Sequence, residues 1–348
     1  MSTLTLGNRP NNEYEVGRQM IGNDSRKTDS KNPVIESLST YLDPAETRSP
    51  ARIVGVVGRG LMHIGCCFEV LRLVKLLPFA ESTWKNPRFV FKIFTSDYLA
   101  LGLPVPERVA CFSHHYRRLH TTLPHRLLRQ TLHGQVALHE IHMTGHRFSL
   151  TMCLSGPFFK EGEFSLNLLV DGEIVFILSF TIVPGWVLKS SAPEALLISR
   201  LQGVKAHHTQ ISLATETLHH VAPPALLLAA LQGIACALGI GEIASVCATK
   251  HICYAEVSAD LCKSAYDDFF AELGIAQNAA GFFLTPVPIQ DKPLAAIKKG
   301  HKLRTKEKRE FKRQITERVS QSILDNLAAG AEPSRAEHPI QIPVAVES

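Results

Sequence analysis

The segment PPALLLAALQGIACALGIGEIASV, residues Pro223–Val246, is the most informative part of the sequence for the fold. Its two prolines can open a helix, because the missing proline N–H costs nothing in the first turn. Ala225–Leu238 is almost wholly apolar, so the predicted helix must be buried. Gly239 ends it, and Ile243–Ala248 predicts a short strand. A buried helix leading into a strand indicates a sheet wrapped around that helix.

Strand signals lie on both sides of this unit. Asp171-Gly172, flanked by β-branched and aromatic residues, predicts a two-residue hairpin turn. A helix is expected over Ala265–Leu273, closed by Gly274. The predicted strands are Phe148–Leu154, Glu163–Val170, Glu173–Val183, Glu194–Leu201 and Gly281–Pro288. The fold class is therefore α+β: an N-terminal helical region followed by a mostly antiparallel sheet around a buried helix.

The same patterns divide the chain into five segments. Helical spacing extends from residue 51 through PHRLLRQTLHGQVALHEIH and on to residue 147. The predicted division is a flexible N-terminal arm (1–50), a helical region (51–147), an α+β domain (148–290), a basic amphipathic helix (291–330) and a flexible tail (331–348).

Composition bounds the class of protein. The chain has 348 residues, of which 45% are hydrophobic and 20% charged, so it can bury a substantial core and is not wholly disordered. No 18-residue run is free of charges and helix breakers, which argues against a transmembrane helix. The polar N-terminus lacks the apolar core of a secretory signal. We therefore expect a cytoplasmic protein, with peripheral attachment to the inner membrane as an open alternative.

Cysteine and histidine usage predicts no metal site. None of the eight cysteines forms a C-x-x-C pair, so reduced and mostly buried thiols are expected. Eight of the sixteen histidines fall between His114 and His146. His142 and His146 have helical i,i+4 spacing, but no metalloprotease pattern accompanies them. Surface and helix-end positions are the simpler interpretation.

The positive charge is confined to one segment. Lys298–Arg318 holds ten Lys/Arg and three Glu, a net of +7 in a chain of net +5, so the remainder carries −2. Phe311, Ile315, Val319 and Ile323 recur every four residues within or beside it. This predicts a terminal helix that packs on the domain and shows a cationic face to solvent. The alternative is attraction to an anionic membrane surface. Nucleic acid is an unlikely partner, because no aromatic residues are interleaved for base stacking.

Several ordered motifs resemble the bacterial VirK/YbjX family, a domain of unknown function. They cover about residues 60–320 and are HHYRRL (114–119), EGEFSLNL (161–168), FILSFTIV (176–183), LISRLQG (197–203), TETLHHVAPPALLLAALQGIACALGIGEIASV (215–246), YDDFFAELG (266–274) and GFFLTP (281–286). The chain departs from the family where it has His220, Ala222 and Pro224 in place of Gly, Arg and Lys, and Phe270 in place of Trp.

This resemblance implies a Gram-negative protein tied to the cell envelope and to virulence. Family members are linked to surface localisation of an outer-membrane virulence protein and to resistance against antimicrobial peptides. It implies no known reaction. An envelope component is therefore the expected partner.

The order of strand Ala195–Leu201, loop, apolar helix, strand and a helix ending in AELGI also resembles the core of GNAT acyltransferases. The fold is accordingly expected to be GNAT-like. In that family the loop before the central helix binds the pyrophosphate of acyl-CoA through backbone N–H groups, so acyl-CoA is the implied co-substrate. Two features depart from the pattern: Pro223 and Pro224 remove two N–H donors, and the usual tyrosine position falls on Phe270.

Four residues are candidates for a catalytic site: Glu161, Glu163, His251 and Tyr266. Acyl transfer to an amine or hydroxyl needs a base for the nucleophile and an acid for the leaving thiolate. One of the two glutamates could act as base, its pKa raised by neighbouring phenylalanines such as Phe164. His251 follows a strand as a second base, and Tyr266 could supply the acid. The simpler alternatives are a solvated turn for the glutamates and a strand-end cap for His251.

Four further residues are candidates for cofactor binding: Gln202, Gly203, Thr215 and His219. Gly203 permits close backbone approach to a ligand, or only a bend. Thr215 and His219 precede the buried helix, where they could meet a phosphate or serve the start of the helix. The resulting hypothesis is an acyl-CoA-dependent acyltransferase acting on an envelope component or a small amine or hydroxyl substrate. The alternative is a non-catalytic membrane-surface factor for envelope protein localisation or antimicrobial-peptide resistance.

Overall fold

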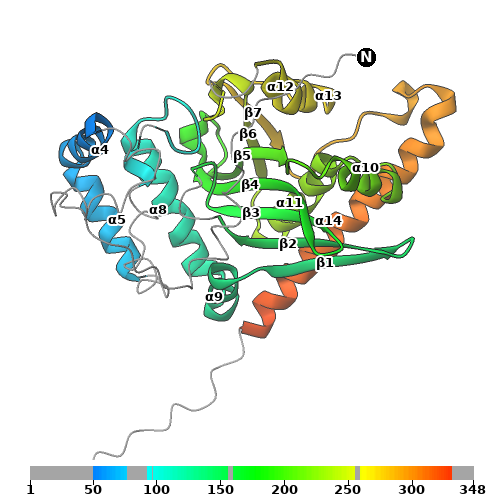
Figure 1. Cartoon of the computed structure of the whole chain (residues 1–348), viewed down its shortest axis with the longest axis horizontal. Coiled ribbons are helices and arrows are strands. Elements are labelled where there is room, and N and C mark those ends of the chain that lie inside the picture. Colours follow the sequence, from blue (N-terminus) through cyan, green and yellow to red (C-terminus); the bar gives the residue numbers. More distant parts are fainter. Residues whose placement is uncertain (1–49, 77–91, 96, 156–159, 255–258, 331–348) are drawn as a thin grey trace, which may run out of the picture.

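The computed structural model describes residues 50–76, 92–95, 97–155, 160–254 and 259–330. At its centre is a seven-stranded sheet whose strands lie in sequence order (Figure 1). Neighbouring strands are antiparallel, except that β5 and β6 are parallel. The α+β class is thus confirmed. The strands are β1 Val136–Met143, β2 His146–Leu154, β3 Phe164–Val170, β4 Glu173–Pro184, β5 Glu194–Gly203, β6 Glu242–Val246 and β7 Phe282–Pro286.

Two-residue turns join β1 to β2 and β3 to β4. Asp171 and Gly172 both have positive φ, 51° and 94°, and form the predicted hairpin turn between β3 and β4. The first hairpin is a correction to the sequence analysis, which expected helix up to residue 147. Residues 136–154 form β1 and β2, and Thr144-Gly145 turns with φ of 50° and 81°. Leu138, Leu150 and Met152 are buried in this hairpin, so tertiary burial overrides the local helical spacing.

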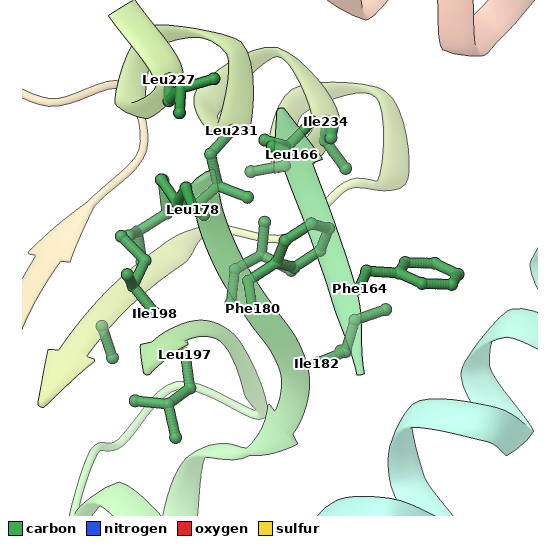
Figure 2. Packing of buried hydrophobic residues seen from close by; sticks show 14 of the residues in the cluster. Phe164, Leu166, Leu178, Phe180, Ile182, Leu197, Ile198, Leu227, Leu231 and Ile234 are labelled. Atoms are coloured by element: carbon green, nitrogen blue, oxygen red, sulfur yellow. The ribbon is translucent and has the colours of Figure 1, made fainter. Parts of the chain in front are cut away.

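Helix α11, Pro223–Leu238, is the buried helix that the sequence predicts. Figure 2 shows its side chains Leu231 and Ile234 facing Leu166 of β3 and Leu178 of β4. Gly239 ends the helix in the left-handed conformation at φ 69°, with its N–H donating to Cys236 O. The sheet covers one side of α11, and another helix must cover the remaining apolar surface.

That second cover is α14, Lys302–Gly330. The predicted apolar stripe is confirmed: Phe311, Ile315, Val319 and Ile323 are all buried. Thr316 Oγ1 donates to Ala229 O of α11 over 2.9 Å, which ties the two helices together. The helix begins later than predicted, because residues 294–301 form two short 3-10 segments, Leu294–Ala296 and Lys299–His301. The predicted N-terminal arm and C-terminal tail lie outside the described residues, apart from Pro50.

The N-terminal helices belong to the same core. They are α4 Pro50–Met62, α5 Ile64–Leu76, α8 Val105–Thr122 and α9 His125–His133. α5 and α8 lie side by side at the left of Figure 1 with α4 above α5, and α8 packs against β4. One continuous cluster of buried residues runs from Val70 on α5 to Ile323 on α14. No helix within the described ranges is long and apolar enough to cross a membrane.

A crossover connects the two parallel strands. It contains α10, His208–Thr217, and then α11. β5 and β6 pair only through residues 196–198 and 243–245, while the far end of β5 stays paired with β4 as far as Gly203. The predicted helix over 265–273 is composite: α12 Ala259–Lys263, a π-helical turn Ser264–Asp268, and α13 Phe269–Glu272. The π-turn stands beside the point where β5 and β6 separate.

The contact between α11 and α14 is testable at Gly233. A Cβ added there would come within 2.5 Å of Thr316 O and 3.0 Å of Ser320 N, both backbone atoms of α14. We expect Gly233→Ala to destabilise the protein by about 1–3 kcal/mol in urea unfolding, because the helices must move apart. Gly58→Ala on α4 is the control, since its Cβ would meet nothing within 4 Å. It should be neutral or stabilising by up to ~1 kcal/mol. Equal effects of the two substitutions would contradict the packing.

Candidate functional site

The turn Glu161-Gly162-Glu163 carries two glutamates whose carboxylates contact different sets of residues. Gly162 has φ 147°, and an added Cβ would lie 2.9 Å from Phe180 N on β4. Only glycine fits this close approach. The chain therefore lies flat against β4 and enters β3 immediately afterwards. The two acidic side chains on either side of the glycine form separate polar centres.

Glu163 forms a fully enclosed centre. Its side chain has 0% exposure; Lys92 Nζ lies 2.8 Å from Oε1, and Tyr98 donates to that oxygen over 2.6 Å. Tyr116 of α8 donates to Oε2, also over 2.6 Å. Burial, reinforced by the negative charge of Glu163, raises the pKa of both tyrosines, so they remain neutral donors. This centre joins α8 and the segment around Lys92 to the sheet.

Glu161 forms the second centre, with residues from β5 and from the chain after β6. Its Oε2 lies 3.6 Å from Arg200 Nε, and its Oε1 lies 3.4 Å from His251 Nε2 and 3.5 Å from Cys253 Sγ. The side chains of Glu161 and His251 are 10% and 7% exposed. Because Cys253 N–H donates to His251 Nδ1 over 3.3 Å, the ring proton of a neutral His251 lies on Nε2 and faces Glu161.

The electrostatics of Glu161 differ from the sequence prediction. Burial alone would raise the pKa of this carboxyl group, which is what the apolar neighbourhood suggested. The contact with His251 and the positive charge of Arg200 outweigh burial and lower its pKa instead. Glu161 is therefore ionised at neutral pH. A raised pKa, which the sequence analysis allowed for one of the two glutamates, is wrong for Glu161, because it took no account of His251 and Arg200.

Tyr266 completes this second centre from the π-helical turn. Its hydroxyl accepts a hydrogen bond from Leu201 N over 3.1 Å, and its ring centroid lies 4.8 Å from that of His251. Burial raises the pKa of Tyr266, so it is a neutral phenol that still carries a proton to donate. Leu201 lies on β5 just beyond its pairing with β6. The Tyr266 hydroxyl thus accepts a backbone hydrogen bond from β5 just beyond the point where the pairing of β5 with β6 ends.

The four candidate cofactor residues are scattered. Gln202 joins the edge of the Glu161 centre, because Arg200 Nε donates to its Oε1 over 3.3 Å. Gly203 is approached by its own chain, since an added Cβ would lie 3.0 Å from Ile211 Cδ1 on α10. Thr215 donates to Ile211 O within α10. His219 follows α10 at φ 53°, with its ring 4.7 Å from that of Phe311 on α14. The last two residues serve helix packing rather than the Glu161 centre.

The sequence analysis missed several partners. Arg200 is a buried charge within the otherwise apolar strand β5, and that anomaly was a usable signal. Nothing in the sequence around Cys253 or Lys92 marked either residue as part of a polar site. Tyr116 lies in the HHYRRL motif but was given no role. His142 and His146, considered as a helical pair, instead lie on opposite strands of the β1–β2 hairpin.

The Glu163 centre supports a stability prediction. Lys92→Met removes the cation beside a carboxylate with 0% exposure, so we expect a loss of about 3–5 kcal/mol in urea unfolding. Arg117→Met breaks an exposed ion pair with Glu69, 3.1 Å apart, and should cost only about 0–1 kcal/mol. If Lys92→Met were as mild as Arg117→Met, Glu163 would not be an anchor of the fold.

A family model described as a protein of unknown function, DUF535, matches residues 51–321. The chain matches no curated protein and no solved structure. The match covers the N-terminal helices, the whole sheet and most of α14. The chain therefore belongs to the DUF535 family, which is the VirK/YbjX family and has no assigned function.

Proposed function

We propose that this protein is an acyl-CoA-dependent acyltransferase whose acceptor is an amine or hydroxyl group, and whose reacting centre is built on Glu161. The observation that carries the proposal is the separation of β5 and β6 beside a buried, ionised carboxylate. The strands pair through residues 196–198 and 243–245 and then part. Glu161, Arg200, His251 and Tyr266 gather where they do so. A GNAT-like arrangement of strand, crossover helix and strand supports the same proposal.

The separated strands suit the acyl donor. Pantetheine is an extended arm with amide groups, and an exposed strand edge binds such a chain through backbone hydrogen bonds. The edge of β5 beyond Ile198 is no longer paired with β6. Residues 199–201 of this edge are buried and the Tyr266 hydroxyl takes the N–H of Leu201, so the proposed arm would bind along the exposed end of β5 at Gln202.

The residues divide the proton transfers between them. Glu161 accepts the proton of the attacking amine or hydroxyl, and the new bond forms to the thioester carbonyl carbon as its C–S bond breaks. Tyr266 donates its phenolic proton to the departing thiolate and regains one from solvent, while Glu161 releases the proton it accepted to solvent. His251 and Arg200 hold the carboxylate in place. The family resemblance suggests that the acceptor belongs to the cell envelope.

The test begins with binding and then measures transfer. Calorimetry with acetyl-CoA and long-chain acyl-CoA, with CoA and free fatty acid as controls, should show binding that needs both the CoA and the acyl group. In a steady-state assay, Glu161→Gln should lower kcat/KM by roughly 10²–10⁴ while acyl-CoA binding is retained. Glu173→Gln, at an exposed position at the start of β4, is the matched control and should change neither.

The pH dependence adds a second readout. A base must be deprotonated to act, so the rate falls as pH falls through its pKa. Because the pKa of Glu161 is lowered from 4.5, the acid limb of kcat/KM should lie below pH 4.5, and Glu161→Gln should lack it. An acid limb near pH 6.5 would transfer the role of base to a histidine. Absence of binding to either acyl-CoA would refute the enzymatic proposal.

A second candidate, attachment to an anionic membrane surface, is favoured by the exposed cations of α14. Lys302, Arg304 and Lys306 face solvent, whereas the apolar stripe of the helix is used in packing. Attachment through this helix would therefore be electrostatic and would weaken as salt is added. The stripe itself is buried, and the large apolar side chains that α14 leaves exposed are Leu303, which lies between two of these cations, and Leu324.

This candidate makes a quantitative prediction. Each cation near an anionic surface contributes about 1 kcal/mol, so Lys302→Gln/Arg304→Gln should weaken binding to phosphatidylserine vesicles about 30-fold in low salt. Arg126→Gln/Arg129→Gln removes two exposed cations of α9 and should leave vesicle binding nearly unchanged. Vesicle co-sedimentation measures both pairs. Equal losses in the two would mean that the binding follows overall charge rather than α14.

A further inference from the structure

The Glu161 centre also has the make-up of a metal site. Glu161, His251 and Cys253 each offer one ligand atom, and the three atoms lie within 4.8 Å of one another. His251 and Cys253 come from the same short segment after β6, whereas Glu161 comes from the turn before β3. A carboxylate, an imidazole and a thiolate are the side chains that zinc prefers.

Two of the three separations between these atoms match the spacing around a tetrahedral ion. With Zn–N and Zn–O of about 2.0 Å and Zn–S of about 2.3 Å, tetrahedral ligands lie roughly 3.3 Å apart for N and O, and roughly 3.5 Å apart for S and O. The observed separations are 3.4 Å from His251 Nε2 to Glu161 Oε1 and 3.5 Å from Cys253 Sγ to Glu161 Oε1. The first distance is longer than the usual 2.7–3.2 Å of an N–H···O hydrogen bond. Glu161 therefore already lies at coordination spacing from both partners, and the third pair of ligand atoms lies within 4.8 Å.

His251 supplies an independent observation. The residue is 5% exposed, and the one described partner of its buried Nε2 atom is Glu161 Oε1 at 3.4 Å, a contact that lacks the geometry of an ordinary hydrogen bond. Buried polar atoms are nearly always satisfied, so one that is not indicates a missing partner such as an ion. The atom is directed toward Glu161, at the centre of the three ligands.

We propose that Glu161, His251 and Cys253 bind one zinc ion, leaving the fourth coordination position open. The thiolate and imidazole favour zinc over magnesium or calcium, which prefer oxygen ligands. Arg200, 3.6 Å from Glu161 Oε2, would hold the carboxylate from outside the ligand shell and leave Oε1 for the metal. With one thiolate and one carboxylate, the ion and its ligands are electrically neutral.

Binding requires a small rearrangement. The Cys253 thiol releases its proton, and the ring proton of His251 moves to Nδ1, which ends the 3.3 Å contact with Cys253 N–H. Zinc binding at a structural site is far stronger than one such weak contact, so this loss does not decide the outcome.

The zinc proposal does not rest on acyl transfer. Glu161 cannot, however, bind zinc and act as the base at the same time. A carboxylate bound to zinc cannot accept a proton from an acceptor substrate. If both proposals hold, one equivalent of Zn²⁺ stops transfer and a chelator restores it. Zinc binding is therefore measured without acyl-CoA, and acyl-CoA binding is measured in the presence of chelator, so that either proposal can fail alone.

The experiment titrates the full-length protein, reduced and freed of metal, with Co²⁺ and then Zn²⁺. One equivalent of Co²⁺ should produce the near-ultraviolet absorption of a cobalt–thiolate bond, and one equivalent of Zn²⁺ should remove it. Cys253→Ser should abolish the absorption and weaken Zn²⁺ binding by more than the ~100-fold that accompanies loss of an outer partner. Cys236→Ser, which removes an exposed thiol on α11, is the matched control and should change nothing.

Three results would overturn the proposal: wild-type protein that gains no thiolate absorption, absorption that survives Cys253→Ser, or absorption that Cys236→Ser removes. Far-ultraviolet circular dichroism verifies that each variant is folded. Should Cys253→Ser fail to fold, Glu161→Gln keeps the shape of the side chain and removes one anionic ligand. It must then weaken Zn²⁺ binding at least ~10-fold for the site to stand.

Discussion

The burial of α11 is the constraint from which the rest of the structure follows. This helix is apolar around most of its circumference, so both of its sides must be removed from water. The sheet covers one side and α14 covers the other, with Gly233 allowing the two helices to touch closely. Because α11 lies within the connection between β5 and β6, its position on the sheet makes these two strands neighbours, and parallel ones.

That parallel pair creates the candidate site. The two strands are held together at residues 196–198 and 243–245 and separate beyond them. Backbone groups beyond the separation need partners, and Tyr266 supplies one to Leu201 from a π-helical turn. Turns of this kind are frequent at functional sites, because they shift one side chain out of helical register. The chain after β6 then brings His251 beside the same carboxylate.

The contrast between the two neighbouring glutamates explains why only one is a candidate for chemistry. Glu163 has three partners within 2.8 Å and no exposure, so its carboxylate serves the fold. Glu161 has longer contacts, from 3.4 to 3.6 Å, and its partners are a histidine, a thiol and a guanidinium group. Such groups can exchange a proton or a metal ion without dismantling the core. The proposed proton transfer and the proposed zinc binding would both depend on these longer contacts.

The sequence alone determined the features that depend on neighbours along the chain. The buried helix with its Gly239 end, the Asp171-Gly172 hairpin and the apolar stripe of α14 are all as predicted, because turn chemistry and hydrophobic spacing are local. The family resemblance was likewise readable from ordered motifs and is shown by the family match. Local spacing failed at residues 136–147, where pairing with β2 overrode a helical pattern.

The tertiary structure decided the contents of the site. Glu161 meets His251 and Cys253 from ninety or more residues away, and no local pattern encodes such a meeting. The sequence named Glu161, His251 and Tyr266 separately, but it could not show that Arg200 lowers the pKa of Glu161, or that Thr215 lies within another helix. Periodicity along the chain fixes which residues are buried. Which buried residues touch depends on how the helices and strands pack, and only the folded chain determines that.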